Sequence, residues 1–162
     1  MAAGLSTEEM RAMAERFWHT LYVERDLDAV GSMFALDGFY TDVPIADGGA
    51  TGPAQIAARL RIGFEPVQSF DHAIERIVVE GDTVITEHAE TWHFDDQTSV
   101  TLPFVSVQVV GQDGLLVLWR DYSNMDTLLS GAPAWWIDHI MSQPPLAELA
   151  DPGRPVQPDQ PN

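Results

Sequence analysis

Apolar residues recur at helical spacing in the first third of the chain. Met10, Met13 and Phe17 lie on one stripe of a 3.6-residue period, and Ser6 with Glu9 fits the capping box that starts a helix. A proline at position 53 suits the first turn of a further helix. The pattern therefore predicts helices over residues 6–25, 26–34 and 53–64.

From residue 69 onward the apolar period changes to two, which is typical of β-strands. Short turns rich in Gly and Asp separate these strands, as in an antiparallel meander. A shorter run before Pro44 predicts one earlier strand. The expected strands are residues 39–43, 72–80, 83–94, 99–110 and 115–123.

Helices that precede antiparallel strands predict an α+β fold class. A curved sheet packed on three N-terminal helices would leave a cone-shaped pocket between the two layers. One domain is expected over residues 1–142, because a 162-residue chain can bury a single core. Residues 126–142 are expected to form a closing helix or lid, and the proline-rich residues 143–162 an extended or disordered tail.

Composition and charge narrow the partners that the chain can have. The formal net charge of -17 argues against binding to nucleic acid or to an anionic membrane. The chain has no Cys, which excludes disulfides, thiol nucleophiles and thiolate metal sites. No apolar run approaches the ~18 residues of a membrane span, and no signal peptide is evident. Together these features predict a soluble, cytoplasmic protein.

Polar side chains that can exchange protons interrupt the apolar faces of three predicted strands. Strict alternation gives the last of these strands a face made of Leu115, Val117, Trp119 and Asp121. A carboxylate at the end of such an apolar stripe is costly unless it is paired or protonated. Asp121 is therefore either half of a structural ion pair or a working acid or base.

Two further strands show the same kind of pattern. His88 and Glu90 share the more apolar face of their strand, about 7 Å apart along its direction. Tyr40 and Asp42 share one face of the earlier strand. If the sheet curls, the side chains that converge are those of Tyr40, Asp42, His88, Glu90 and Asp121.

Such a group of side chains supports proton transfer. Several carboxyls in one low-dielectric cleft cannot all be ionised, so one becomes a neutral acid while another stays a carboxylate base. A histidine between them can bridge the two, and Tyr40 can orient a water or an oxyanion. Each residue alone also has a structural explanation: Asp121 can pair with a buried Arg, and His88 can be a satisfied core histidine.

Cofactors and metals are not expected. The proton transfers above need none, and the further potential ligand His93 points to the strand face opposite His88 and Glu90. Large aromatic residues are more simply explained as core or pocket wall than as a cofactor site. The residues expected to contact a small hydrophobic substrate are Phe34, Trp92, Phe104, Trp119 and Trp136.

Three short segments carry a family resemblance. Residues 119–122 read Trp-Arg-Asp-Tyr, residues 40–44 read Tyr-Thr-Asp-Val-Pro, and residues 86–90 read Thr-Glu-His-Ala-Glu. In order and spacing they resemble limonene-1,2-epoxide hydrolase-like and polyketide cyclase-like proteins of the nuclear transport factor 2-like superfamily. The resemblance covers about residues 7–130. It implies a cystatin-like α+β barrel with a curved, mixed or antiparallel sheet, often forming a homodimer through that sheet.

The resemblance also implies a role for each polar residue. Asp121 would be the base that activates a water, and Tyr40 with Asp42 would position that water. His88 would bridge two carboxyls, and Glu90 would be the acid that protonates an epoxide oxygen. The chain departs from the family residues Asn, Arg and Asp at the positions of Asp42, His88 and Glu90.

Three functions remain open at this point. The first is hydrolysis of a small hydrophobic epoxide by water activated at Asp121. The second is a ketosteroid isomerase-like or polyketide cyclase-like reaction, an isomerisation or a lyase step, with Asp42 or His88 as the base. The third is non-catalytic binding of a hydrophobic ligand.

Overall fold

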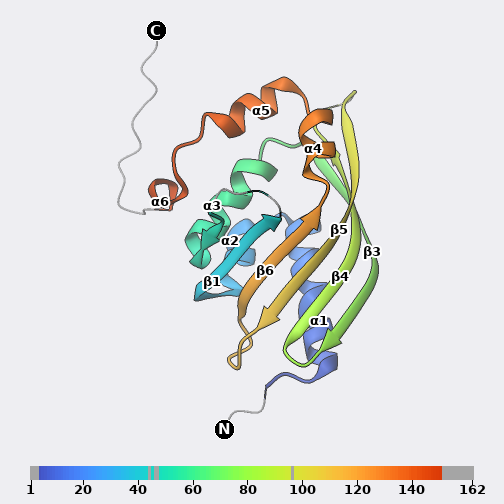
Figure 1. The fold of residues 1–162 in the computed structure, drawn as a ribbon, viewed down its shortest axis with the longest axis vertical. Coiled ribbons are helices and arrows are strands. Elements are labelled where there is room, and N and C mark those ends of the chain that lie inside the picture. Colours follow the sequence, from blue (N-terminus) through green and yellow to red (C-terminus); the bar gives the residue numbers. More distant parts are fainter. Residues whose placement is uncertain (1–3, 44, 46–47, 96, 151–162) are drawn as a thin grey trace.

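A computed structural model describes residues 4–43, 45, 48–95 and 97–150. In it, a curved six-stranded sheet packs against N-terminal helices, and further helices follow the last strand (Figure 1). The expected α+β fold class is confirmed. The N-terminal helices are α1 (Thr7–His19), the π-helical turn η1 (Thr20–Glu24), α2 (Leu27–Ser32) and α3 (Gly52–Phe64). The strands are β1 (Phe34–Val43), β2 (Ala50–Thr51), β3 (Ser69–Glu80), β4 (Thr83–His93), β5 (Ser99–Val110) and β6 (Leu116–Ser123).

The sheet is mixed and open. Its strand order is β2-β1-β6-β5-β4-β3, and β1 and β6 pair in parallel while the other neighbours are antiparallel. Strands β2 and β3 are the two edges, so the sheet curves without closing into the expected barrel. Helix α1 packs on β3 and β4, and α3 packs on β1. The helices thereby cover the face of the sheet that carries the candidate residues.

Alternation along β4 and β5 produces this inner face as the sequence predicts. In β4, His88 and Glu90 are buried among apolar neighbours, and the intervening side chains point to the other face. Strand β5 alternates in the same way and buries Phe104 and Ser106. The capping box at Ser6 that starts α1 is also present.

The prediction for the start of β6 is wrong. Strict alternation placed Val117 on the inner face, but its side chain is 37% exposed, whereas Leu116 is 1% exposed. The register of β5 and β6 shifts between Val109 and Val110, so β6 holds one extra residue at this point. Such a bulge exchanges the faces of the residues before it. Trp119 and Asp121, which follow it, are buried as expected.

The apolar spacing predicted that Phe34 ends the second helix, but Phe34 lies outside that helix. Helix α2 ends at Ser32, and Phe34 opens β1 opposite Leu116 of β6. The parallel pairing continues only from Phe39, because the chain between is irregular. Gly38 lies in this interval, where a Cβ would come within 2.7 Å of the Leu116 carbonyl oxygen. Phe34 thus pairs with a strand that is distant in the sequence, and this pairing cannot be seen in the local sequence.

The C-terminal region is more ordered than a tail. In place of one closing helix, residues 126–142 contribute to two, α4 (Met125–Gly131) and α5 (Ala134–Met141), which Pro133 separates. The expected extended tail from residue 143 contains a short helix, α6 (Leu146–Leu149). Residues 151–162 of that tail lie outside the described residues. Throughout the described ranges, no helix is long and apolar enough to cross a membrane.

Candidate active site

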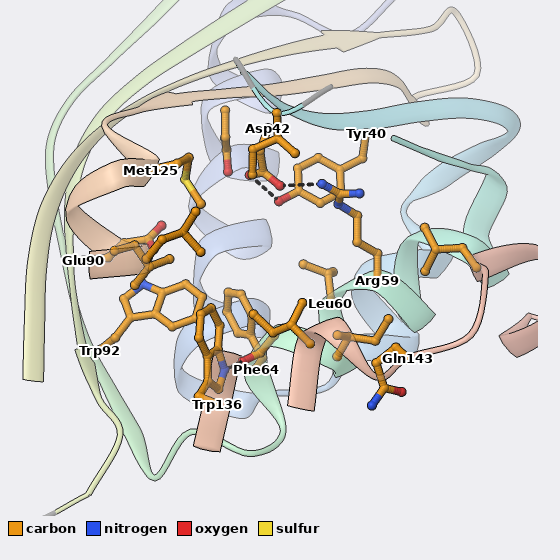
Figure 2. A pocket seen from close by; sticks show the side chains of 18 of the residues that line it. Tyr40, Asp42, Arg59, Leu60, Phe64, Glu90, Trp92, Met125, Trp136 and Gln143 are labelled. Atoms are coloured by element: carbon orange, nitrogen blue, oxygen red, sulfur yellow. Dashed lines mark hydrogen bonds and ion pairs between the residues drawn. The ribbon is translucent and has the colours of Figure 1, made fainter. Parts of the chain in front are cut away.

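A cavity of about 550 Å³ opens between the inner face of the sheet, α3 and the C-terminal helices. Its size lies in the range of small-molecule sites. Most of its wall is apolar, with Leu60, Phe64 and Trp136 on one side in Figure 2. The polar side chains that line it are those of Tyr22, Tyr40, Asp42, Arg59, Glu90, Asp121 and Gln143.

At one side of the cavity, Asp42 is held by two partners. The Tyr40 hydroxyl donates to Asp42 Oδ1 over 2.9 Å, and Arg59 Nη2 donates to Asp42 Oδ2 over 2.9 Å (Figure 2). The Tyr40 ring stacks on Trp119 with 3.9 Å between ring centroids. Both Asp42 oxygens are thus engaged, and the cation of the pair comes from α3.

Glu90 has a different environment, made by two aromatic donors. Tyr22 donates to its Oε1, and the Trp92 indole donates to its Oε2 over 2.8 Å. Burial raises the pKa of Glu90 to about 7, although the bonds from Tyr22 and Trp92 act to lower it, and the nearby Asp42 carboxylate raises it further. Glu90 is therefore a carboxyl that can carry a proton near neutral pH.

Asp121 is also buried, and its polar contacts come from the sheet. Ser106 of β5 and the indole of Trp119 both donate to its Oδ1. Burial first, and then the charges of Asp42 and Glu90, raise the pKa of Asp121 well above its usual range, while the two hydrogen bonds lower it. Because Asp121 and Glu90 share one apolar cavity, we expect them to hold fewer than two negative charges between them.

His88 lies behind the two carboxyls and does not line the cavity. Its Nε2 is 2.8 Å from Ser106 Oγ, and its Nδ1 is 3.0 Å from His72 Nε2 and 3.6 Å from Glu90 Oε1. Burial, and to a lesser degree the charge of His72, lowers the pKa of His88 to about 3. The ring is therefore a neutral connector near pH 7, in contact with Glu90 directly and with Asp121 through Ser106.

The structure brings together four of the five residues predicted to carry the chemistry. Tyr40, Asp42, Glu90 and Asp121 all line the cavity, and His88 stands one contact behind. Of the aromatic residues predicted to contact substrate, one does not reach the cavity. Phe34 packs instead on the core rings of Phe17 and Trp119. The predicted aromatic residues that do line the cavity are Trp92, Phe104, Trp119 and Trp136.

Four polar residues of the site were not predicted from the sequence, namely Tyr22, Arg59, Ser106 and Gln143. Ser106 was accessible to prediction, because it lies at an inward position of an alternating strand. Arg59 lies one turn after the buried Ile56 on α3, so a helical projection places it beside the apolar stripe. Tyr22 offered no signal beyond its aromatic ring. Within the described ranges, no group of three or more acidic or histidine side chains is placed to hold a metal ion.

Comparison with known proteins fits this geometry. The sequence profile of the SnoaL-like domain matches residues 14–119, which is more than half of the chain. The chain belongs to the SnoaL-like family. Domains of this family are part of the nuclear transport factor 2-like superfamily, so the cone-shaped fold expected from the resemblance is confirmed. No curated protein matches the chain.

Solved structures similar to this SnoaL-like protein include an epoxide hydrolase, a protein with a ketosteroid isomerase-like fold and a SnoaL-like polyketide cyclase. An LEH-like epoxide hydrolase from M. tuberculosis is 29% identical, with a TM-score of 0.63 over 82% of this chain and 98% of that one. A protein with a ketosteroid isomerase-like fold from Catenulispora acidiphila, solved with trimethylamine, is 23% identical, with a TM-score of 0.62 over 75% and 94%. A SnoaL-like polyketide cyclase from Shewanella putrefaciens is 17% identical, with a TM-score of 0.65 over 76% and 84%. The last two show the fold alone.

Proposed function

We propose that this SnoaL-like protein is a cofactor-independent enzyme that hydrolyses a small hydrophobic epoxide. The observation that carries the proposal is the pair of buried carboxyls, Glu90 and Asp121, on the wall of one apolar cavity. Because the pKa of each is raised, the pair can hold one proton and one negative charge near neutral pH. Epoxide opening by water needs an acid and a base together.

In the proposed step, Asp121 takes a proton from a water whose oxygen attacks an epoxide carbon. The carbon–oxygen bond breaks as Glu90 gives its proton to the departing epoxide oxygen, and a diol results. Tyr40, already fixed by its bond to Asp42, presents its hydroxyl oxygen to the water. Between turnovers Asp121 loses the proton that it took from water, and Glu90 regains one. The cavity wall excludes bulk water, which strengthens these interactions.

Two further points support hydrolysis. The similar structure with the greatest sequence identity among those above is the epoxide hydrolase, at 29%. The apolar lining, with Trp92, Leu60 and Trp136, suits a hydrophobic substrate that presents one polar atom to the carboxyls.

A panel of small hydrophobic epoxides in heavy-oxygen water tests the proposal. We expect a diol with one labelled oxygen, and we expect Asp121→Asn to lower kcat at least roughly 100-fold while its circular dichroism spectrum stays that of the parent. Asp138→Asn, an exposed Asp on α5, is the matched control and retains activity. Unchanged turnover in Asp121→Asn would refute the role of Asp121.

A second reaction class is favoured by the position of Asp42. This carboxylate lines the cavity close to Glu90, which can donate a proton to an enolate oxygen. An isomerisation, cyclisation or lyase step with Asp42 as the base would then exchange a carbon-bound proton for deuterium without incorporating heavy oxygen. His88 is a poorer base for this step, since it lies outside the cavity wall. If the protein binds apolar probes but turns over neither epoxides nor substrates of the isomerisation, cyclisation or lyase class, the result would support a non-catalytic binding function.

We also propose that the protein forms a homodimer through the outer face of its sheet. Apolar side chains on that face are partly exposed, with Val78 opposite Ile85 and Val105 opposite Tyr122 across the strands. On the same face, Arg120 Nε is buried without a hydrogen-bond partner among the described residues. A second copy of the chain would cover these apolar side chains.

A further inference from the structure

A chain of hydrogen bonds crosses the sheet from Asp121 to the edge strand β3. Ser106 donates to Asp121 Oδ1, His88 Nε2 lies 2.8 Å from Ser106 Oγ, and His72 Nε2 lies 3.0 Å from His88 Nδ1. Each of the four residues comes from a different strand, namely β6, β5, β4 and β3. The path therefore runs across the strands, from the cavity wall to the margin of the sheet.

The contacts allow only one consistent direction when Asp121 is a carboxylate. Ser106 donates its hydroxyl proton to Asp121, so its oxygen is free to accept from His88 Nε2. The other nitrogen of His88, Nδ1, then lacks a proton and accepts from His72 Nε2. No member of the chain is left with two donors or two acceptors facing each other.

The outer end of the chain, His72, is separate from the cavity. His72 is half-buried and does not line the cavity, so its exposed part contacts solvent outside the cavity. Its ring stacks on Tyr22 with 4.2 Å between centroids, and the ring of His88 lies 4.5 Å from that of Trp18. These aromatic contacts keep both imidazole rings oriented toward each other.

We propose that His72, His88 and Ser106 form a proton relay that connects Asp121 with solvent at the edge of the sheet. When Asp121 carries the proton, each hydrogen bond of the chain runs the other way, and the ring protons of His88 and His72 are both on Nδ1. Asp121 then passes its proton to Ser106 Oγ as the Ser106 proton moves to His88 Nε2. The proton on His88 Nδ1 passes to His72 Nε2, and His72 Nδ1 releases one proton to water. One proton leaves and Asp121 becomes a carboxylate, while every other member gains and loses one proton. In the reverse direction the relay protonates Asp121.

The surroundings of His88 suit such a relay. The titratable groups that face it are His72 from β3, Glu90 from β4, Asp121 through Ser106, and Tyr22 near His72 and Glu90. Burial lowers the pKa of His72 to about 4, as it lowers that of His88. Near pH 7 both imidazoles are neutral, and a neutral imidazole has the one donor and one acceptor that a relay needs.

The role of the relay in turnover rests on the proposed function, but its existence can be tested without a substrate. With ¹⁵N-histidine in the protein, NMR measures how fast the ring N–H proton of His88 exchanges with water. We expect His72→Phe, which keeps a ring stacked on Tyr22, to slow this exchange at least tenfold. His93→Phe, at the outer face of β4, is the matched control and leaves the rate unchanged.

A second variant, His72→Gln, keeps a hydrogen-bonding side chain that does not take up protons, and it should slow the exchange in the same way. Unchanged or faster exchange at His88 in the folded variants would overturn the relay. With an epoxide that the parent hydrolyses, the relay further predicts an unchanged single-turnover rate and a steady-state rate about tenfold lower in His72→Phe. Equal losses in both rates would overturn it as well. Should the parent hydrolyse no epoxide, the proposed function fails and the exchange rates still decide the relay.

Discussion

At Glu90, burial competes with hydrogen bonding. Removal from water raises its pKa to about 7, and the bonds from Tyr22 and Trp92 only partly oppose this effect. Asp42, three strands away in the sheet order, lines the same cavity but has Arg59 beside it. Asp42 thus has an arginine from α3 as a partner, whereas Glu90 is held by Tyr22 and Trp92.

The pKa of Glu90 predicts a pH dependence of stability. A carboxyl whose pKa rises from 4.5 to about 7 on folding stabilises the native state below pH 4.5, and this stabilisation is lost as pH rises through about 7. In Glu90→Gln this contribution is absent. The free energy of unfolding of the parent, minus that of Glu90→Gln, should fall by roughly 2 to 3 kcal/mol between about pH 5 and about pH 8. Urea denaturation at both pH values measures it, and a constant difference would contradict the raised pKa.

Individual residues of the site were predictable to the extent that alternation alone places them. Asp121 and Glu90 lie on inward strand positions, and the period-two pattern found both. Their partners were not found, because pairing depends on which strands are neighbours and on how helices pack. Ser106 meets Asp121 through the β5–β6 register, and Tyr22 reaches Glu90 from a π-helical turn.

Among the elements, the C-terminal helices close the cavity. The Trp136 indole on α5 donates to the Gly63 carbonyl oxygen of α3 over 3.0 Å, and its ring packs 5.6 Å from that of Trp92. Residues of α4, α5 and α6 also line the cavity. Thus the segment that composition indicated to be partly tail contributes one wall of the site.

Trp136→Ala tests this wall. Loss of the ring removes the hydrogen bond to Gly63 and part of the apolar surface of the cavity. We therefore expect affinity for an apolar fluorescent probe to fall at least tenfold, and Tm to decrease. Trp135→Ala is the matched control, because the Trp135 side chain is 43% exposed. Fluorescence titration measures both variants. Equal affinity in Trp136→Ala and Trp135→Ala would show that α5 does not close the cavity.

Element types were more predictable than their relationships. The four later strands and the capping box of α1 follow directly from local sequence. The parallel pairing of β1 with β6, the bulge at Val117 and the end of α2 before Phe34 do not. These three features depend on contacts between segments that are distant in the sequence. Tertiary packing determines such contacts, and local periodicity does not predict them.

For the molecule as a whole, helices cover one face of the sheet (Figure 1). The other face exposes apolar side chains. Among the exposed outer residues, Val105 lies near the centre, on β5. The net charge of -17 opposes association of chains, so the proposed dimer depends on this apolar face.

The proposed homodimer predicts a particle mass twice that of the 17.9 kDa chain. Val105→Glu would bury two carboxylates in the proposed interface, and we expect it to produce monomers that still bind an apolar probe in the cavity. Val23→Glu is the control, because Val23 is exposed on η1 and does not belong to the sheet. Light scattering coupled to size exclusion gives the masses. A monomeric parent, or a dimeric Val105→Glu variant, would refute this interface.

The proton content of the two buried carboxyls is the central claim, because the acid, the base and the relay all depend on it. A pH titration by ¹³C NMR of labelled Asp and Glu carboxyls measures it directly in the folded protein. We predict that Glu90 titrates near pH 7 and that Asp121 titrates well above the exposed Asp side chains. Titration of both groups at or below about 4.5, with two full charges in the cavity at neutral pH, would contradict the account.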